Sequence, residues 1–243
     1  MQLDFTHAMF IYKQDLPRHN TGMNTPVIAF FAGTVRPMPG DGRPTGIFKL
    51  PVDGPVQIGI EGLINDAQAD RRVHGGPEKA VHHYPMENHR RLAAEFDEQA
   101  AGFISGGMGE NISTEGMTEE TVCIGDIYTV GSVRLQVSQP RSPCWKIDAK
   151  FDREGITRFV AQHGIAGWYY RVLETGSAQA GDVLKLVERN ADPFSLSDWW
   201  AIMRTPRVSL DVLQRLADTP GLTPAYREKI LQRIDWLRRN APG

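Results

Sequence analysis

The chain has 243 residues, and its 27 Lys and Arg against 29 Asp and Glu give a formal net charge of −2. This balance excludes general electrostatic attraction to nucleic acid or membranes, and no apolar run approaches the roughly 20 residues that span a bilayer. Two cysteines are too few for a disulfide scaffold, and no basic segment precedes the short N-terminal apolar patch. We therefore expect a cytoplasmic protein without a membrane partner, built as one large domain or as a medium domain with an appendage.

Residues 1–23 are polar and prone to turns, particularly around residues 17–22. We interpret them as a loose N-terminal extension, or as the product of an upstream start codon. An edge strand at residues 5–12 is the alternative interpretation.

Residues 24–190 show mainly the two-residue alternation of β-strands, separated by turn signals. Two helical patterns, at residues 85–101 and 152–162, interrupt the strands. Many short strands with few helices are typical of a barrel or a sandwich. The predicted strands are residues 27–34, 46–50, 127–130, 133–137, 168–173 and 183–187, of which the third and fourth form a hairpin at Gly131-Ser132.

The pattern becomes helical in residues 193–240. Ser195 with Asp198 three residues later predicts a capping box, Ser209 can cap a second helix, and Pro224 can begin a third. Three helices invite a DNA-binding interpretation, but residues 190–243 hold eight Lys and Arg against six Asp and Glu, without a strongly basic stripe. We therefore expect this part to dock a partner or form a homodimer rather than to bind nucleic acid.

The segment 139–146, Gln-Pro-Arg-Ser-Pro-Cys-Trp-Lys, ends a predicted strand and places a cysteine on a stiff turn. Cys144 lies between Arg141 and Lys146, and neighbouring cations favour the reactive thiolate form of a cysteine. Most lone cysteines are small core residues, and Cys123 fits that alternative because its neighbours are apolar. The segment therefore makes Cys144 the candidate nucleophile or metal ligand.

Two glycine-rich segments could approach a ligand closely. Residues 71–80 combine two glycines with basic groups, which favours a phosphate or a pterin, and a solvated surface turn is the alternative. Residues 106–112 end in Glu110 and Asn111, a candidate proton donor and a candidate hydrogen-bond partner, or an ordinary loop. The candidate residues of the first segment are Arg71, Arg72, His74, Gly75, Gly76 and Lys79.

Three histidines, His82, His83 and His89, raise the question of zinc. Adjacent residues point apart in a helix or a strand, and no pair has the spacing of a helical zinc motif. Zinc is therefore the weaker interpretation of these histidines. His83 or His82 can still donate a hydrogen bond to a ligand, although a structural histidine is the commoner outcome.

Four separated segments together resemble the MOSC domain, a fold shared with the C-terminal part of molybdenum cofactor sulfurases. They are residues 73–77 (Val-His-Gly-Gly-Pro), 109–112 (Gly-Glu-Asn-Ile), 124–126 (Ile-Gly-Asp) and 139–144 (Gln-Pro-Arg-Ser-Pro-Cys). The whole chain is similar to the YiiM-type branch of that family. The resemblance implies a mainly β fold with α: a MOSC-type β-barrel at residues 24–190 followed by a three-helix domain at residues 193–240.

The resemblance also implies a cofactor, molybdenum bound to molybdopterin, with Cys144 as its protein ligand. It implies two-electron reduction of N-hydroxylated compounds such as hydroxylaminopurines, amidoximes and hydroxylamines, with Glu110, His74 or water supplying protons. We assign cofactor binding to Arg71, Arg72, Gly75, Gly76, Lys79, His83, Asn111, Arg141, Ser142 and Lys146.

The electron source must be a separate protein, because the sequence has no cysteine set for an iron–sulfur cluster and no dinucleotide fingerprint. We expect a flavoprotein or a ferredoxin-type donor. Two other functional classes remain open. One is a carrier of molybdenum cofactor or of sulfur, with a persulfide on Cys144, and the other is a regulator that binds through the helical tail.

Overall fold

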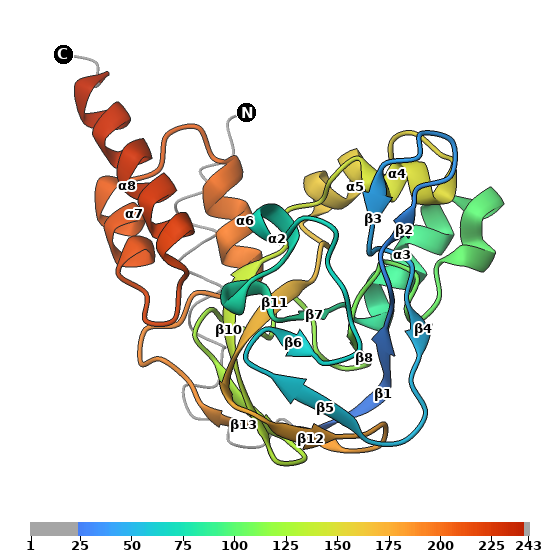
Figure 1. Cartoon of the computed structure of the whole chain (residues 1–243). Helices are drawn as coiled ribbons and strands as arrows, with labels where there is room; N and C mark the ends of the chain where they lie inside the picture. Colours follow the sequence, from blue (N-terminus) through green and yellow to red (C-terminus); the bar gives the residue numbers. More distant parts are fainter. Residues whose placement is uncertain (1–23, 241–243) are drawn as a thin grey trace.

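The computed structural model describes residues 24–240, in which a β-barrel carries helices on two sides (Figure 1). The predicted N-terminal extension and the alternative strand at residues 5–12 lie outside the described residues.

The barrel closes because β1 pairs with β13 on one side and with β8 on the other. Around the barrel the order is β1, β13, β9, β10, β11, β7 and β8, and all neighbours are antiparallel except β7 and β8. The seven barrel strands found in residues 24–240 are β1 (Asn24–Ala32), β7 (Val81–His83), β8 (Ile112–Thr114), β9 (Ile127–Val130), β10 (Val133–Pro140), β11 (Trp168–Glu174) and β13 (Val183–Glu188). The predicted barrel is therefore confirmed.

Shorter strands extend the barrel at its rim. Three of them, β12, β5 and β6, form a small antiparallel sheet, while β2 pairs with β3 and β4 pairs with the end of β1. Their bounds are β2 (Arg36–Pro37), β3 (Pro44–Thr45), β4 (Leu50–Pro51), β5 (Val56–Gly59), β6 (Gly62–Leu63) and β12 (Gly176–Ala178).

The β9–β10 hairpin confirms the turn predicted at Gly131-Ser132, with Val130 opposite Val133. The predicted strand at residues 46–50 is wrong apart from its last residue, which belongs to β4. A Cβ on Gly46 would lie 2.3 Å from the carbonyl oxygen of Ala67, so only a glycine allows the neighbouring loop to approach this closely.

Helices on one side of the barrel enclose a second apolar cluster that includes Tyr84, Leu92 and Ile147. The helix predicted at residues 85–101 divides into α3 (Met86–Glu95) and a 3-10 helix, η2 (Asp97–Gly102). The helix predicted at residues 152–162 is shorter, because Asp152 has a φ of 49° and ends an unpredicted helix instead. These elements are α4 (Lys146–Phe151) and α5 (Ile156–His163), and a short α2 (Arg71–His74) and a 3-10 helix, η1 (Pro77–Lys79), lie nearer the barrel.

The three predicted C-terminal helices are α6 (Leu196–Arg204), α7 (Leu210–Ala217) and α8 (Pro224–Arg239). The predicted capping box is present, since the Asp198 amide donates to the Ser195 hydroxyl and the Ser195 amide donates to the Asp198 carboxylate. Apolar side chains of these helices, including Leu213 and Ile230, join the same buried cluster as the barrel interior. The division into two domains stays a prediction.

The helices described in residues 24–240 are all too short or too polar to cross a membrane.

Candidate functional site

A pocket of about 70 Å³ lies where β10 leaves the barrel. Its walls come from four separate parts of the chain: residues 45–49, residues 67–69, His74 in α2, and Gly109. The turn after β10 completes it with Arg141, Cys144 and Lys146. Segments that are far apart in sequence therefore meet at the predicted cysteine.

The turn that carries Cys144 is fixed at both ends. The Arg141 amide donates to the Gly167 carbonyl at 3.0 Å, which holds the start of the turn. The Cys144 carbonyl accepts from the Ile147 amide at 3.0 Å and from the Thr157 hydroxyl at 3.1 Å, so α4 and α5 hold its end. Cys144 is half-buried. Its thiol therefore lines the pocket from a backbone that is hydrogen-bonded on each side.

Cys123 differs from Cys144 in its burial. It is fully buried, and burial raises the pKa of its thiol to about 12. This agrees with its interpretation as a core residue.

Four of the residues that line the pocket have basic side chains: Lys49, His74, Arg141 and Lys146. Lys146 donates to the Pro44 carbonyl at 3.0 Å, and Arg141 donates to the Met108 carbonyl at 3.1 Å. Burial lowers the pKa of His74, and the nearby cations Lys146 and Arg141 lower it further, so the imidazole is neutral at pH 7. Among the described residues that line the pocket, none carries a carboxylate. The site therefore presents positive charge to a ligand.

Glu110 is not at the pocket surface. Its carboxylate is fully buried and accepts hydrogen bonds from the amides of Gly106 and Met108, at 2.6 and 2.9 Å. The ring of His89 and the hydroxyl of Ser113 lie within 2.9 and 3.1 Å of the same carboxylate. The contacts show a carboxylate that shapes the glycine-rich loop, while its predicted role as a proton donor stays a prediction.

Asn111 and His83 also lie inside the barrel wall. The Asn111 side chain accepts from the His82 amide and donates to the Phe31 carbonyl, so it ties three segments together. The His83 ring lies between the hydroxyls of Tyr170 and Thr114, and burial lowers its pKa to about 3.

The remaining predicted residues lie around the pocket rather than in its wall. Arg71 is exposed and forms an ion pair with Glu61, while Arg72 belongs to the same short helix. The Ser142 hydroxyl lies 2.8 Å from the hydroxyl of Tyr226 in α8. Lys79 is half-buried, and Gly75 and Gly76 lead from α2 into η1.

Sequence reasoning missed one wall of the pocket. This wall is formed by Thr45, Gly46, Ile47 and Lys49, which belong to residues 43–49, here called the strap; Asp66 bonds Lys49 from behind. The strap packs on α4: the Arg43 guanidinium lies 3.7 Å from the centre of the Trp145 ring, and Lys150 donates to the Ile47 carbonyl. The one available signal was Lys49, a lone charge in an apolar run.

The donor groups fit a molybdenum cofactor. A cysteine thiolate is a soft ligand that suits a molybdenum ion held by a dithiolene, and lysine and arginine suit the phosphate of the pterin. Groups of three or more metal-binding side chains are absent from residues 24–240.

Comparisons with known proteins agree with this arrangement. The family model of the MOSC domain matches residues 70–185. The Escherichia coli protein YiiM is 38% identical over 203 residues, which cover 84% of this chain and 90% of YiiM. The Bacillus subtilis protein YflK, described as uncharacterized, is 36% identical, with 79% of this chain and 86% of YflK covered.

A Gibberella moniliformis protein named "Reductase" is 35% identical over 82% of this chain, and the match covers 34% of that longer protein. The crystal structure of Escherichia coli YiiM superposes with a TM-score of 0.73 at 33% identity, covering 91% of this chain and 96% of that structure. The YiiM structure from Geobacillus stearothermophilus gives the same TM-score at 31% identity, with 86% and 99% covered. MOSC domains are associated with molybdenum cofactor binding, and these matches support a role related to that cofactor. The chain belongs to the MOSC domain family, and YiiM proteins are among the relatives that match most of its length.

Proposed function

We propose that this protein is a molybdenum-cofactor-dependent reductase of N-hydroxylated compounds, with Cys144 as the protein ligand of the metal. One observation carries the proposal: the half-buried thiol of Cys144 lines a pocket that holds Lys49, Arg141 and Lys146 and, among its described lining residues, no carboxylate. The relative named "Reductase" supports an oxidoreductase role.

The chain's own residues have separate tasks in this proposal. Cys144 holds the metal, and Arg141 and Lys146 neutralise the phosphate of the pterin. His74 is neutral and offers a hydrogen bond without adding a further charge. The bound cofactor supplies two-electron redox chemistry that none of the amino-acid side chains provides.

We propose that part of the strap moves when the cofactor enters. The pocket of about 70 Å³ is much smaller than the roughly 300 Å³ or more that sites for organic ligands usually offer. The strap's side-chain contacts to α4 and to Trp145, the residue before it, include two cation–π contacts and two hydrogen bonds from lysines to carbonyls. Such contacts are individually weak, so displacement of residues 43–47, with the Lys49–Asp66 ion pair kept, is an accessible way to enlarge the pocket.

The reduction of an N-hydroxylated compound consumes two electrons and two protons, breaks the N–O bond, and yields an amine and water. We propose that the electrons come from a separate flavoprotein or ferredoxin-type donor. The helical tail is the proposed docking surface for that donor or for a second copy of this chain.

The test is an anaerobic assay of the cofactor-loaded protein with reduced methyl viologen as electron donor and a hydroxylaminopurine, an amidoxime or a hydroxylamine as substrate. We expect substrate-dependent oxidation of the viologen, which the Cys144→Ser variant abolishes. Cys123→Ala is the matched control, because it removes the other thiol without touching the pocket, and it should retain activity. Absence of reduction for all three substrate classes would contradict the proposal and favour the carrier function.

A further inference from the structure

Lys49 is a buried lysine whose side chain forms part of the pocket wall. Its side chain is 7% exposed and its Nζ lies 2.6 Å from the carboxylate of Asp66, which is 2% exposed. The same pocket is lined by Cys144. A lysine whose ammonium is nearly out of solvent therefore belongs to the wall of the pocket that contains the proposed metal ligand.

Asp66 is itself held in place by the barrel. Its carboxylate accepts from the Gly33 amide and from the Asn111 amide group, each at 2.9 Å. Asn111 is in turn bonded to the backbones of His82 and Phe31, on two barrel strands. The Lys49 ammonium therefore ends a chain of hydrogen bonds that is anchored in the barrel wall, which fixes its position in the pocket.

The other candidate proton donors are less suitable. Glu110 has its carboxylate engaged by several donors and does not line the pocket. His74 lines the pocket, but burial and the neighbouring cations keep its imidazole neutral. Arg141 also lines it, and a guanidinium does not release its proton at neutral pH.

We propose that Lys49 is the proton donor of the reaction and that Asp66 is the residue that positions it; this inference rests on the proposed function. The Lys49 ammonium protonates the hydroxyl oxygen of the substrate as the N–O bond breaks. The two electrons come from the flavoprotein or ferredoxin-type donor through the cofactor, and the oxygen leaves as water. The amine nitrogen takes the second proton from solvent, and solvent at the pocket mouth then reprotonates Lys49.

The electrostatic surroundings agree with this role. Burial lowers the pKa of Lys49, while Asp66 and Glu110 act in the opposite direction and Arg141 adds to the lowering. His82 and Lys150 also face this group. A lysine with a lowered pKa transfers its proton at a pH closer to neutrality than a surface lysine does.

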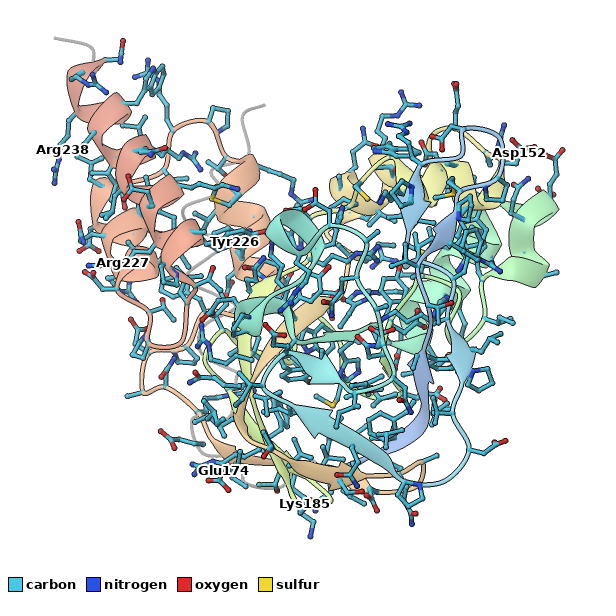
Figure 2. All side chains as sticks on the ribbon, in the orientation of Figure 1. Asp152, Glu174, Lys185, Tyr226, Arg227 and Arg238 are labelled. Atoms are coloured by element: carbon cyan, nitrogen blue, oxygen red, sulfur yellow. The ribbon has the colours of Figure 1, made fainter. Side chains whose placement is uncertain are left out.

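The first test compares Lys49→Arg with wild type in the viologen assay over a range of pH. Arginine keeps the charge but holds its proton, so we expect normal pterin fluorescence of the loaded protein and a kcat lower by about 100-fold or more. In wild type, kcat should fall as the pH rises through the pKa of Lys49, and the variant should lack this fall. Lys185→Arg is the matched control, because Lys185 is exposed on β13, does not line the pocket, and lies at the end of the molecule opposite α4 (Figures 1 and 2). This change should leave the profile unchanged.

The second test needs no activity. In the cofactor-free protein labelled with carbon-13 lysine, each lysine gives its own NMR signal, and the signal that disappears in Lys49→Arg is that of Lys49. We expect the Lys49 signal to titrate at a lower pH than the Lys185 signal. Asp66→Asn should lower the midpoint further, because it removes the carboxylate that stabilises the ammonium. If the Arg variant fails to fold by circular dichroism, the kcat profile of Asp66→Asn decides instead, with a loss at lower pH expected.

The outcomes separate the two proposals. A wild-type protein that carries cofactor but reduces none of the substrates overturns the proposed function itself. An active wild type whose Lys49→Arg variant keeps both its kcat and its pH profile overturns the role of Lys49 alone, as does a Lys49 signal that titrates with that of Lys185.

Discussion

The hydroxyl of Tyr226 in α8 donates a hydrogen bond to the carbonyl of Pro140, at 3.2 Å, where β10 ends and the turn to Cys144 begins. The same phenol lies 2.8 Å from the Ser142 hydroxyl. Figure 2 shows Tyr226 on the side of α8 that faces the barrel. The helical tail therefore contacts the turn that carries the candidate metal ligand, so a change in the tail can alter the site.

Tyr226→Phe should loosen this turn without breaking the fold. The change removes two hydrogen bonds while the ring stays packed, so we expect the free energy of unfolding to fall by about 1–2 kcal/mol. The half-life of bound cofactor should also shorten. Urea unfolding and the release rate of pterin fluorescence measure the two effects. An unchanged release rate would show that the contact supports only the fold.

Glu110→Gln should lower the stability of the fold rather than change the catalytic step directly. An amide cannot accept from all the donors around this carboxylate, so we expect a loss of about 3 kcal/mol, measured by urea unfolding. Glu115→Gln is the control, since Glu115 pairs with Arg90 at the surface and its loss should cost less than about 1 kcal/mol. A stable but inactive Glu110→Gln protein would instead return Glu110 to the role of proton donor.

Glu119 should make stability depend on pH. Burial raises the pKa of Glu119 to about 7, although Gly167 and Asn88 donate hydrogen bonds to it. Its folded pKa exceeds its unfolded one, so its contribution is complete below pH 4.5 and is lost as the pH rises through about 7. The full change amounts to about 3 kcal/mol.

Glu119→Gln keeps an acceptor for both donors and cannot ionise. The variant should therefore gain stability relative to wild type between pH 5 and pH 8, and urea unfolding at these two pH values measures the gain. An equal difference from wild type at both pH values would contradict a raised pKa for Glu119.

Arg43→Ala should speed the entry of cofactor. The change removes the cation–π contact with Trp145, which is one of the side-chain contacts that hold the strap against α4. Such a contact contributes about 0.5–1 kcal/mol at an exposed site, so we expect uptake of free cofactor to accelerate by about twofold to fivefold in stopped-flow fluorescence. Arg90→Ala, another exposed arginine away from the pocket, should leave the rate unchanged. An unchanged rate for Arg43→Ala would show that the strap does not limit entry.

Much of the barrel could be predicted because its strands carry local signals. The β9–β10 hairpin combines alternating apolar residues with a glycine turn, and Ser195 with Asp198 marks the start of α6. Strands β7 and β8 have three residues each and are buried throughout, so they offer no alternation to detect. Their pairing depends on contacts between residues far apart in sequence.

The residues of the candidate site also fall into two groups, those that a local sequence signal predicts and those that it does not. Cys144 and Arg141 follow from one continuous segment, whereas Lys49 and Asp66 meet them only through the closure of the barrel. The motif at residues 124–126 shows the converse, because a Cβ on Gly125 would lie 2.1 Å from the carbonyl of Pro220. The absence of a side chain at Gly125 lets the segment before α8 pack against it. A residue of the family motif therefore has a packing role here.

The most direct test of the central claim is the cofactor content of the protein as purified. We would express wild type, Cys144→Ser and Cys123→Ala in a host that makes molybdenum cofactor, and measure molybdenum by mass spectrometry and oxidised pterin by fluorescence. We predict near-stoichiometric metal and pterin in wild type and Cys123→Ala, and loss of the metal in Cys144→Ser. A wild-type protein with neither metal nor pterin, even after addition of free cofactor, would contradict the account.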